Sequence, residues 1–406
     1  QMMSYGYDPK LSEMSIKPPI FLTSTFAFES AEAGASFFRV SLGQAQEGDP
    51  ESAGLMYSRF NNPNMEVLED RLALFDRAEE AAVFSSGMAA ISTTLMALAH
   101  SGSVILQSTP LYGGTESLLR KFLPNYGIQS VDFFAAASED EIRAAAETAM
   151  ALGPVSVIYA ETPTNPTNDL VDLTACNRVA DMIADKQGTR PWIVVDNTFL
   201  GPVGSAPLQQ GADVLVYSLT KYVGGHSDLI AGSALGASEA MALVRSLRGY
   251  LGTNLDPHTC WMLLRSLETV KIRMDAAALG AAKVAAFLRD HPKVSRVRYL
   301  GFLGEGNRDA DVFKAQCTSA GSTFAFDLAD EASAFRMLNA LQVMKLAVSL
   351  GGTETLICHP GSTTHRGVDP ELRKRQGFSD GLVRVSVGIE NPDDLIADLK
   401  QALDKV

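Results

Sequence analysis

The stretch Val214-Leu-Val-Tyr-Ser218-Leu-Thr220-Lys221-Tyr-Val-Gly224-Gly225-His226 places a lysine directly behind a short apolar run. The run 214–217 predicts a buried strand, and the polar turn behind it ends in two glycines. Two interpretations of this turn are open. In the first, Ser218 and Thr220 are ordinary turn residues and Lys221 faces solvent. In the second, Lys221 forms a Schiff base, and the two hydroxyls beside it hold a phosphate.

The sequence on either side of this stretch alternates between strand and helix patterns. Strands are predicted at 81–84, 103–107, 130–134, 155–160 and 192–196, and helices at 89–100, 112–126, 139–151 and 173–186. A further strand at 229–235 and a helix at 240–248 follow Lys221. This alternation predicts an α/β fold in which helices flank a large, mostly parallel sheet.

Five polar or glycine-rich positions follow the ends of these strands: Gly87, Tyr112, Asn165, Asp196 and Lys221. Ligands of such sheets bind outside the carboxyl ends of the strands, so we expect the five to share one edge. The small residues before the helix at 89–100 let backbone N–H groups approach an anion. Asp196 ends a buried strand and needs a partner, which is either a helix cap or salt bridge, or a protonated heterocycle nitrogen.

The two ends of the chain differ from this central region. Residues 1–60 predict an irregular arm with a polar loop at 41–54, and an arm of this length packs on something, such as a second subunit. Residues 61–256 form the large domain, and long helices in 257–288 lead into a smaller C-terminal domain, 257–406. Tyr57 and Arg59 precede a helix that begins at Pro63. They are either a packed aromatic beside a solvent-facing arginine or a pair that binds a phosphate.

Length and composition exclude several classes of function. The 406 residues suffice for two domains, and 46% apolar with 20% charged residues is typical of a soluble enzyme. A net charge of −13 argues against a nucleic-acid partner. We find no apolar run long enough for a membrane span and no secretory signal. Four widely spaced cysteines without a CxxC pair predict reduced thiols in the cytoplasm and no metal site.

Several longer motifs occur in order along the chain: Tyr57-Ser-Arg59-Phe-Asn-Asn-Pro63, Ser85-Ser-Gly87-Met88, Leu111-Tyr112-Gly-Gly, Glu161-Thr-Pro-Thr-Asn165-Pro166, Val195-Asp196-Asn-Thr198, Tyr217 to His226, Ser349-Leu-Gly-Gly, His359-Pro-Gly-Ser-Thr-Thr-His365 and Val383-Arg384-Val-Ser-Val-Gly-Ile389-Glu390. Together they resemble the pyridoxal-phosphate (PLP) enzymes of cysteine and methionine metabolism, the cystathionine γ-synthase and methionine γ-lyase family. The resemblance spans nearly the whole chain. It implies the fold type I transferase architecture, with a seven-stranded type of sheet and a smaller C-terminal α+β domain.

The resemblance implies roles for the residues around the cofactor. Lys221 holds PLP through a Schiff base and then moves protons, and Asp196 keeps the pyridine nitrogen protonated. The backbone N–H groups of Gly87 and Met88 bind the phosphate. The hydroxyls of Ser218 and Thr220 complete that phosphate site.

Further roles implied by the resemblance concern the substrate and the second subunit. Tyr112 stacks on the ring and serves as an acid or base, and Asn165 lies near the 3′-oxygen of PLP. Arg384 binds the α-carboxylate of an amino-acid substrate, helped by Ser349. In this family, Tyr57 and Arg59 reach the phosphate of the neighbouring subunit, which implies a homodimer or homotetramer with shared active sites.

Two positions bear on the reaction that is expected. Val348 stands where members that handle cystathionine more often carry a glutamate, and a valine is more similar to methionine γ-lyases and O-acylhomoserine sulfhydrylases. Of these, we expect a methionine γ-lyase-like carbon–sulfur lyase that acts by α,γ-elimination. Gly114 stands where methionine γ-lyases typically have a cysteine. The alternatives therefore stay open. They are γ-replacement, as in O-acetyl- or O-succinylhomoserine sulfhydrylases and cystathionine γ-synthase, and the cystathionine γ-lyase reaction.

Overall fold

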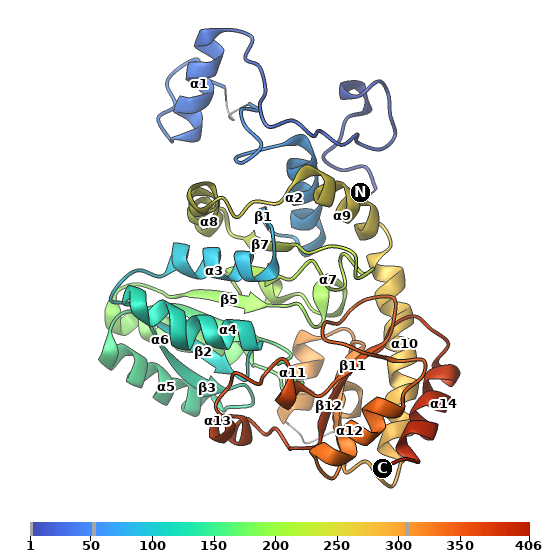
Figure 1. The fold of residues 1–406 in the computed structure, drawn as a ribbon. Coiled ribbons are helices and arrows are strands. Elements are labelled where there is room, and N and C mark those ends of the chain that lie inside the picture. The colour runs from blue at the N-terminus through green and yellow to red at the C-terminus, as the bar shows by residue number, and fades with distance from the viewer. Residues whose placement is uncertain (1–2, 51–53, 305–307) are drawn as a thin grey trace.

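A seven-stranded sheet forms the centre of the computed structural model, which describes residues 3–50, 54–304 and 308–406 (Figure 1). The strand order is β1-β7-β6-β5-β4-β2-β3. Only β7 runs against its neighbours, which confirms the mostly parallel sheet. The strands are β1 (Glu80–Phe84), β2 (Val104–Thr109), β3 (Gln129–Phe134), β4 (Val155–Glu161), β5 (Trp192–Asp196), β6 (Val214–Tyr217) and β7 (Gly232–Gly236).

Strand β7 begins later than its sequence predicts. The apolar run from 229 suggests a strand start there, but the structure starts β7 at Gly232. The preceding Ala231 is bonded elsewhere, because its N–H donates to Thr220 Oγ1 at 3.0 Å and its carbonyl accepts from the Thr220 backbone at 3.2 Å. These bonds tie the segment before β7 to the turn that carries Lys221.

Helices cover both faces of the large sheet. One face packs against α3 (Gly87–Leu98) and α8 (Ser238–Leu251), and the other against α2 (Pro63–Asp76), α5 (Glu139–Leu152), α6 (Leu173–Gln187) and α9 (Pro257–Leu267). Helix α2 begins at Pro63 behind the N-cap Asn62, as the sequence predicts. The expected helix 112–126 is divided into α4 (Gly113–Ser117), a π-helical turn (Leu118–Phe122) and a 3₁₀ turn (Leu123–Tyr126). A short helix, α7, spans Gly201–Gly204.

A second sheet of five strands lies in the C-terminal part of the chain, in the order β10-β11-β12-β9-β8. Its strands are β8 (Arg296–Arg298), β9 (Thr323–Asp327), β10 (Lys345–Leu346), β11 (Leu356–Cys358) and β12 (Leu382–Ser386). The helices of this part are α10 (Val270–Arg289), α11 (Arg308–Gln316), α12 (Glu331–Ala340), α13 (Pro370–Arg375) and α14 (Pro392–Leu403). Helix α9 contributes Leu263 to the core of the large sheet, and the domain boundary at 256/257 stays a prediction.

The N-terminal arm extends away from the rest of the molecule, at the top of Figure 1. It contains a helix, α1 (Ala31–Ser41), which corrects the expectation that the arm is irregular throughout. The side chain of Ser30 caps this helix by accepting from the Ala33 N–H at 3.1 Å, and the Phe37 ring packs on Phe28. Of the predicted loop 41–54, residues 51–53 lie outside the described residues.

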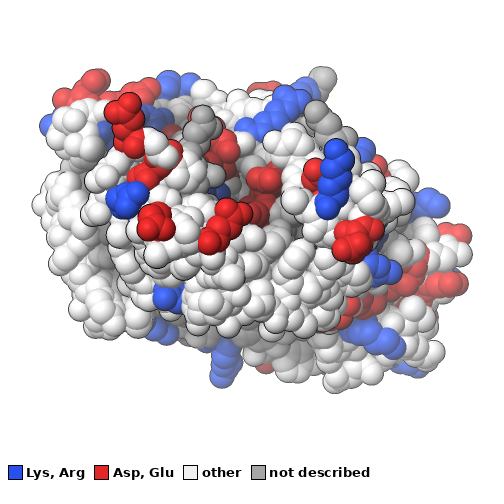
Figure 2. Space-filling model, turned by 90° about the horizontal axis from the view of Figure 1, so that it is seen from above, with Lys and Arg blue, Asp and Glu red and all other residues white. Residues whose placement is uncertain are grey.

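Viewed from the side of the arm, the surface shows scattered acidic and basic side chains between broad uncharged areas (Figure 2). No helix among the described residues is both long and apolar enough to cross a membrane.

Candidate active site

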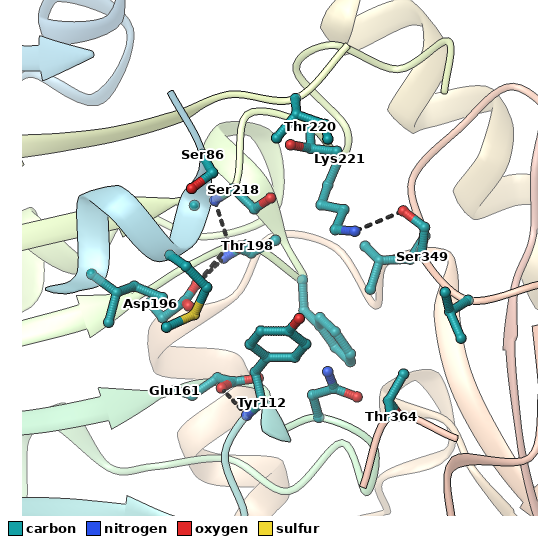
Figure 3. A pocket seen from close by; sticks show the side chains of 18 of the residues that line it. Ser86, Tyr112, Glu161, Asp196, Thr198, Ser218, Thr220, Lys221, Ser349 and Thr364 are labelled. Carbon is teal, nitrogen blue, oxygen red and sulfur yellow. Dashed lines mark hydrogen bonds between the residues drawn. The ribbon is translucent and has the colours of Figure 1, made fainter. Parts of the chain in front are cut away.

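A cavity of about 270 Å³ opens where the carboxyl ends of the large sheet meet the C-terminal part of the chain (Figure 3). All five residues predicted at the sheet edge line it: Gly87, Tyr112, Asn165, Asp196 and Lys221. The parallel strands of the sheet bring them together, as the alternation of strands and helices implied. Ser349 and Arg384, from the C-terminal part, line the opposite wall.

One end of the cavity is formed by the start of helix α3. The side chain of Ser86 caps the helix by accepting from the Ala89 N–H at 3.0 Å. A Cβ atom added to Gly87 would lie 2.8 Å from Ser218 Cβ, so only glycine allows the two segments to approach this closely. The first-turn N–H groups and the Ser218 hydroxyl therefore line a cradle that suits an anion.

Thr220 also lines the cavity, but its hydroxyl is already engaged. Thr220 Oγ1 donates to the Ala231 carbonyl at 3.1 Å and accepts from the Ala231 N–H. This hydroxyl therefore braces the lysine turn.

Lys221 extends from the turn behind β6 into the cavity. Its Nζ donates to Ser349 Oγ at 2.6 Å, across the space between the two parts of the chain (Figure 3). Burial lowers the pKa of Lys221 to about 8, and the positive charge of Arg384 adds to the shift. The amine is therefore neutral, and nucleophilic, far more often near pH 7 than an exposed lysine is.

Asp196 stands at the end of β5, on the floor of the cavity. Its Oδ1 accepts from the backbone N–H of Thr198 at 3.0 Å and from the Thr198 hydroxyl at 2.6 Å. The Tyr159 hydroxyl lies 3.5 Å from Oδ2. Burial raises the pKa of Asp196. A cation placed beside this carboxyl would lower that pKa again, and the resulting carboxylate would stabilise the cation.

Tyr112 points its ring into the cavity, and its backbone is held at the sheet edge (Figure 3). The Tyr112 N–H donates to Glu161 Oε2 at 2.7 Å. Burial raises the pKa of the Glu161 carboxyl well above its ordinary value, and the neighbouring Asp196 charge adds to this shift.

Arg384 provides a buried cation in the wall that faces the sheet. It comes from β12, and its guanidinium donates to Asn165 Oδ1 at 3.0 Å and to the Ser349 carbonyl at 2.9 Å. Ser349 has a left-handed backbone with φ of 93°, which directs its carbonyl toward Arg384 and its hydroxyl toward Lys221. The Arg384 guanidinium could therefore form an ion pair with an anionic group of a small ligand.

Tyr57 and Arg59 do not line this cavity. Arg59 donates to the Gly249 carbonyl, and its guanidinium lies 4.3 Å from the centre of the Phe60 ring. The Tyr57 side chain is largely exposed on the arm. Neither residue contributes to the site of its own chain, and their role across a subunit boundary stays a prediction.

Sequence reasoning missed residues that support the predicted ones. Thr198 donates to Asp196 and accepts from the Ser218 N–H at 3.0 Å, so it connects β5 to the lysine turn. Glu161, Thr198 and Thr364 line the cavity, although they stood in quoted motifs without an assigned role. The signal for Glu161 and Thr198 was proximity, because each lies within a few residues of a position that sequence reasoning singled out. Thr364 stood in the quoted motif that ends at His365, away from any residue with an assigned role.

Comparison with known proteins gives a consistent result. The family model for the Cys/Met metabolism PLP-dependent enzymes matches residues 1–404. An L-methionine gamma-lyase of Fusobacterium nucleatum subsp. polymorphum is 39% identical over 96% of this chain and 93% of its own. A cystathionine gamma-lyase of Bacillus subtilis is 37% identical over 88% of this chain and 90% of its own.

Solved structures agree in fold. A putative O-acetylhomoserine (thiol)-lyase of Campylobacter jejuni has a TM-score of 0.89 and 29% identity, covering 99% of this chain and 98% of its own. That structure carries a pyridoxyl-lysine monophosphate at its position 205. The match over almost the full length, and the cavity with its buried lysine, lead to one conclusion: this chain belongs to the PLP-dependent enzymes of cysteine and methionine metabolism.

Proposed function

We propose that the chain is a methionine γ-lyase-like carbon–sulfur lyase, which removes the γ-substituent of a sulfur amino acid by α,γ-elimination. The observation that carries this proposal is the composition of the cavity wall. Arg384 supplies a buried cation for an α-carboxylate, and the apolar side chains of Ile230, Val348 and Leu350 line the same cavity. An uncharged thioether fits beside such side chains without loss of a polar partner.

The residues present fit PLP, the cofactor of this family. The cradle between Gly87 and Ser218 suits the phosphate group, because it combines open helix N–H groups with a hydroxyl. Asp196, buried and linked to Ser218 through Thr198, suits the protonated ring nitrogen. Lys221 extends into the same cavity, with an amine whose pKa is lowered to about 8. We assign these residues, with Met88 and Asn165, to the cofactor site; Thr220 lines it, and its hydroxyl would have to leave the Ala231 carbonyl to donate to the phosphate.

Each of the chain's own groups then has a defined task. Lys221 would hold the cofactor through its amine, and this amine would move a proton away from the substrate Cα. Arg384 and Ser349 orient the substrate through its carboxylate. Tyr112 transfers a proton near the γ-position, where the sulfur leaves. When bound, PLP supplies the conjugated ring that takes up the charge left by proton removal.

One contact favours the alternative reaction, γ-replacement on an O-acylhomoserine. A Cβ atom at Gly114 would lie 2.6 Å from Tyr112 Cε1 and 3.1 Å from the Met88 sulfur. The Tyr112 ring thus occupies the space in which methionine γ-lyases would begin a cysteine side chain. A cystathionine γ-lyase reaction is less favoured, because Val348, which lines the cavity, offers no carboxylate for a second amino group.

One assay separates these possibilities. The holoenzyme is incubated with methionine, cystathionine or an O-acylhomoserine, each with and without a thiol, and release of α-ketobutyrate is measured. We expect methionine alone to give the fastest release. Release only from the O-acylhomoserine, and loss of release when a thiol is present, would assign replacement instead.

We extend the proposal to the assembly and its location. The exposed arm, with Tyr57 and Arg59 outside their own cavity, supports a homodimer or homotetramer with shared active sites. The four cysteines are unpaired, which supports the cytoplasmic location expected from the sequence.

A further inference from the structure

The peptide group between Leu111 and Tyr112 is held at both of its polar ends. Its N–H, from Tyr112, donates to Glu161 Oε2 at 2.7 Å. Its carbonyl, from Leu111, accepts from His365 Nε2 at 3.1 Å. The two partners come from different parts of the fold, because Glu161 ends β4 of the large sheet and His365 lies between β11 and α13.

The direction of the second bond follows from chemistry. A carbonyl oxygen only accepts, so His365 carries its hydrogen on Nε2. The Thr364 hydroxyl lies 2.9 Å from His365 Nδ1 and donates to it, which fixes the same tautomer. Burial lowers the pKa of His365 to about 4, and the charge of Arg384 adds to this, so the ring stays neutral with one hydrogen to give.

The packing around this peptide leaves little freedom. Leu111 and His365 are buried, and the His365 ring lies edge-on to Phe378 at 5.2 Å between ring centres. A Cβ atom at Gly113 would lie 2.2 Å from the Thr364 carbonyl oxygen, so the two segments touch at backbone level. Water cannot replace either partner without a shift of the segment.

The Tyr112 side chain depends on this support. It projects into the cavity and is 40% exposed. In the described part of the chain no residue bonds to its hydroxyl, so the direction of the ring is set by the main chain that carries it. A tilt of the peptide plane would move the ring relative to Lys221 and Asp196, and small misplacements of reacting groups are costly.

We propose that Glu161 and His365 are positioning residues, which fix the Leu111–Tyr112 peptide from both sides and so orient the Tyr112 side chain for the reaction. The effect on turnover rests on the proposed function, whereas the bonds to the peptide are a property of the chain. The arrangement also connects the large sheet to the C-terminal part across the active site.

The first test measures the peptide itself. Amide hydrogen exchange at Tyr112 is followed in the holoenzyme and in the PLP-free protein, for Glu161→Leu and Glu161→Gln. We expect Glu161→Leu to speed exchange about tenfold in both forms, the size of one hydrogen bond, because the acceptor is lost. Glu161→Gln keeps a carbonyl acceptor and should stay near the parent protein. Equal exchange in all three proteins would overturn the proposal.

The second test measures turnover with His365→Leu and His365→Gln. The leucine variant lacks the donor, so kcat should fall about tenfold while KM stays within about twofold, since Arg384 still binds the carboxylate. Glutamine places a donor near the Nε2 position and should restore most of the activity. If both variants lose kcat equally, the hydrogen bond to Leu111 is not the cause and the proposal fails for His365.

His359→Gln and His359→Leu serve as the matched control. His359 is a second buried histidine of the same motif, and it bonds to the Asp380 carbonyl at 2.9 Å instead of the Tyr112 segment. Tyr112 exchange and kcat should stay at parent values in both variants; a matching loss would refute a specific role for His365. Faster Tyr112 exchange with unchanged turnover in Glu161→Leu would support the bonds but refute the proposed role of Tyr112.

Discussion

At the scale of single residues, the lysine in the cavity shows how burial prepares a reactive group. Within the described residues, the Lys221 amine bonds to the Ser349 hydroxyl alone, and the positive charge of Arg384 repels its protonated form. Both effects favour the neutral amine. The same arginine is the proposed partner of the substrate carboxylate, so one cation would both lower the pKa of Lys221 and bind the substrate.

This gives a prediction for the pH dependence of cofactor binding. The neutral amine attacks the aldehyde of PLP, so the rate of recombination with the PLP-free protein should rise with pH and level off above about 8, the lowered pKa of Lys221. For an exposed lysine, the midpoint of this rise would lie at about pH 10.4. Stopped-flow absorbance across this range measures the midpoint. In Arg384→Gln the midpoint should move upward, because a repelling charge is removed; a downward shift would contradict this.

Arg384 itself gives a second prediction. Arg384→Ala removes the proposed partner of the substrate carboxylate and should raise KM strongly. The fall in kcat/KM should correspond to a loss of about 2–5 kcal/mol in binding free energy. Arg384→Lys keeps the positive charge but cannot keep both hydrogen bonds, to Asn165 and to the Ser349 carbonyl. Its KM should lie between those of the parent protein and the alanine variant. Steady-state kinetics decide this, and an unchanged KM in the alanine variant would place the carboxylate elsewhere.

Sequence reasoning found the functional residues that are polar or charged and directly follow a predicted strand. Lys221 and Asp196 stand directly behind apolar runs, and the topology of the sheet then places them at one edge. His365 could not be found in this way. It belongs to a separate sheet region, and its contact with Leu111 joins residues that are 254 positions apart.

At the scale of elements, the turn from β1 into α3 packs so closely on the lysine turn that it requires a glycine. A Cβ atom at Gly87 would meet Ser218 Cβ at 2.8 Å and the Ser218 Cα at 3.0 Å. Gly87→Ala should therefore push the helix start away from the lysine turn, at a cost of about 1–3 kcal/mol in strain. We expect weaker PLP affinity, measured by dialysis and cofactor absorbance. Gly304→Ala, at an open position without a left-handed φ, is a control for loss of glycine alone.

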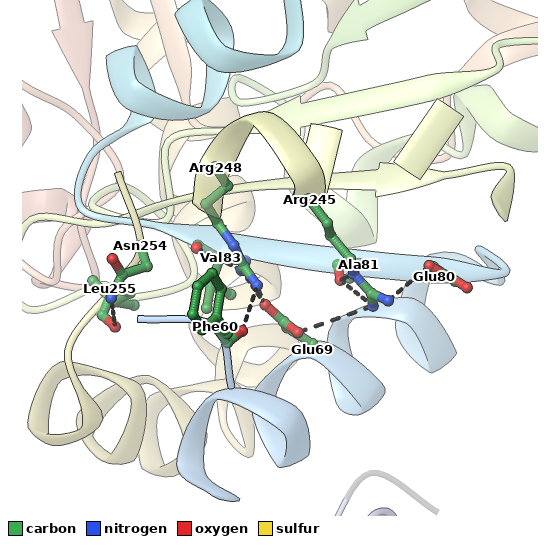
Figure 4. Close-up of polar contacts among 9 residues, drawn as sticks. All are labelled: Phe60, Glu69, Glu80, Ala81, Val83, Arg245, Arg248, Asn254 and Leu255. Carbon is green, nitrogen blue, oxygen red and sulfur yellow. Dashed lines mark hydrogen bonds and ion pairs between the residues drawn. The ribbon is translucent and has the colours of Figure 1, made fainter. Parts of the chain in front are cut away.

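Helices α2 and α8 are joined by a buried ion pair (Figure 4). Arg248 Nη1 lies 2.5 Å from Glu69 Oε1 and donates to the Val83 carbonyl at 3.0 Å. The same carboxylate oxygen accepts from the Val83 N–H at 2.9 Å. The pair thus fixes strand β1 between the two helices, next to the base of the arm.

Breaking this pair should destabilise the fold. Arg248→Ala removes the closer of the two ion-pair partners of buried Glu69 and leaves Arg245 at 4.0 Å, so the free energy of unfolding should fall by up to about 3–5 kcal/mol. Arg178→Ala is the matched control, because its pair with Glu139 is half exposed and its loss should cost about 0–1 kcal/mol. Urea unfolding followed by circular dichroism measures both. Equal losses in the two variants would contradict the difference in burial.

The elements that sequence reasoning missed are those with weak local signals. Strands β8, β10 and β11 have only two or three residues each, too few for a visible alternation. They are held by pairing with longer neighbours such as β12. Helix α1 was not predicted because polar and small residues surround it, although Ser30 is a good N-cap. The large sheet was predictable because its central strands, such as β5 and β6, are buried apolar runs, although the edge strand β3 is partly exposed.

At the scale of the whole molecule, the arm points to a second subunit. It carries exposed apolar side chains, among them Leu11 at 80% and Ile16 at 83% exposure, which a partner would cover. Tyr57 and Arg59 sit on this arm, away from the cavity of their own chain. If each arm completes the phosphate site of its partner, neither subunit can work alone.

This arrangement predicts complementation between two inactive variants. Lys221→Ala lacks the amine, and Arg59→Ala lacks the arm residue that we propose binds the phosphate in the partner's site. In a mixed dimer, one cavity receives both defects and the other receives none, because the two residues act in different sites. Equal mixing, with unfolding and refolding to exchange subunits, should restore about a quarter of the parent activity for random pairing of dimers. Each variant refolded alone is the control. If the mixture is no more active than the sum of its parts, Arg59 acts within its own chain or not at all.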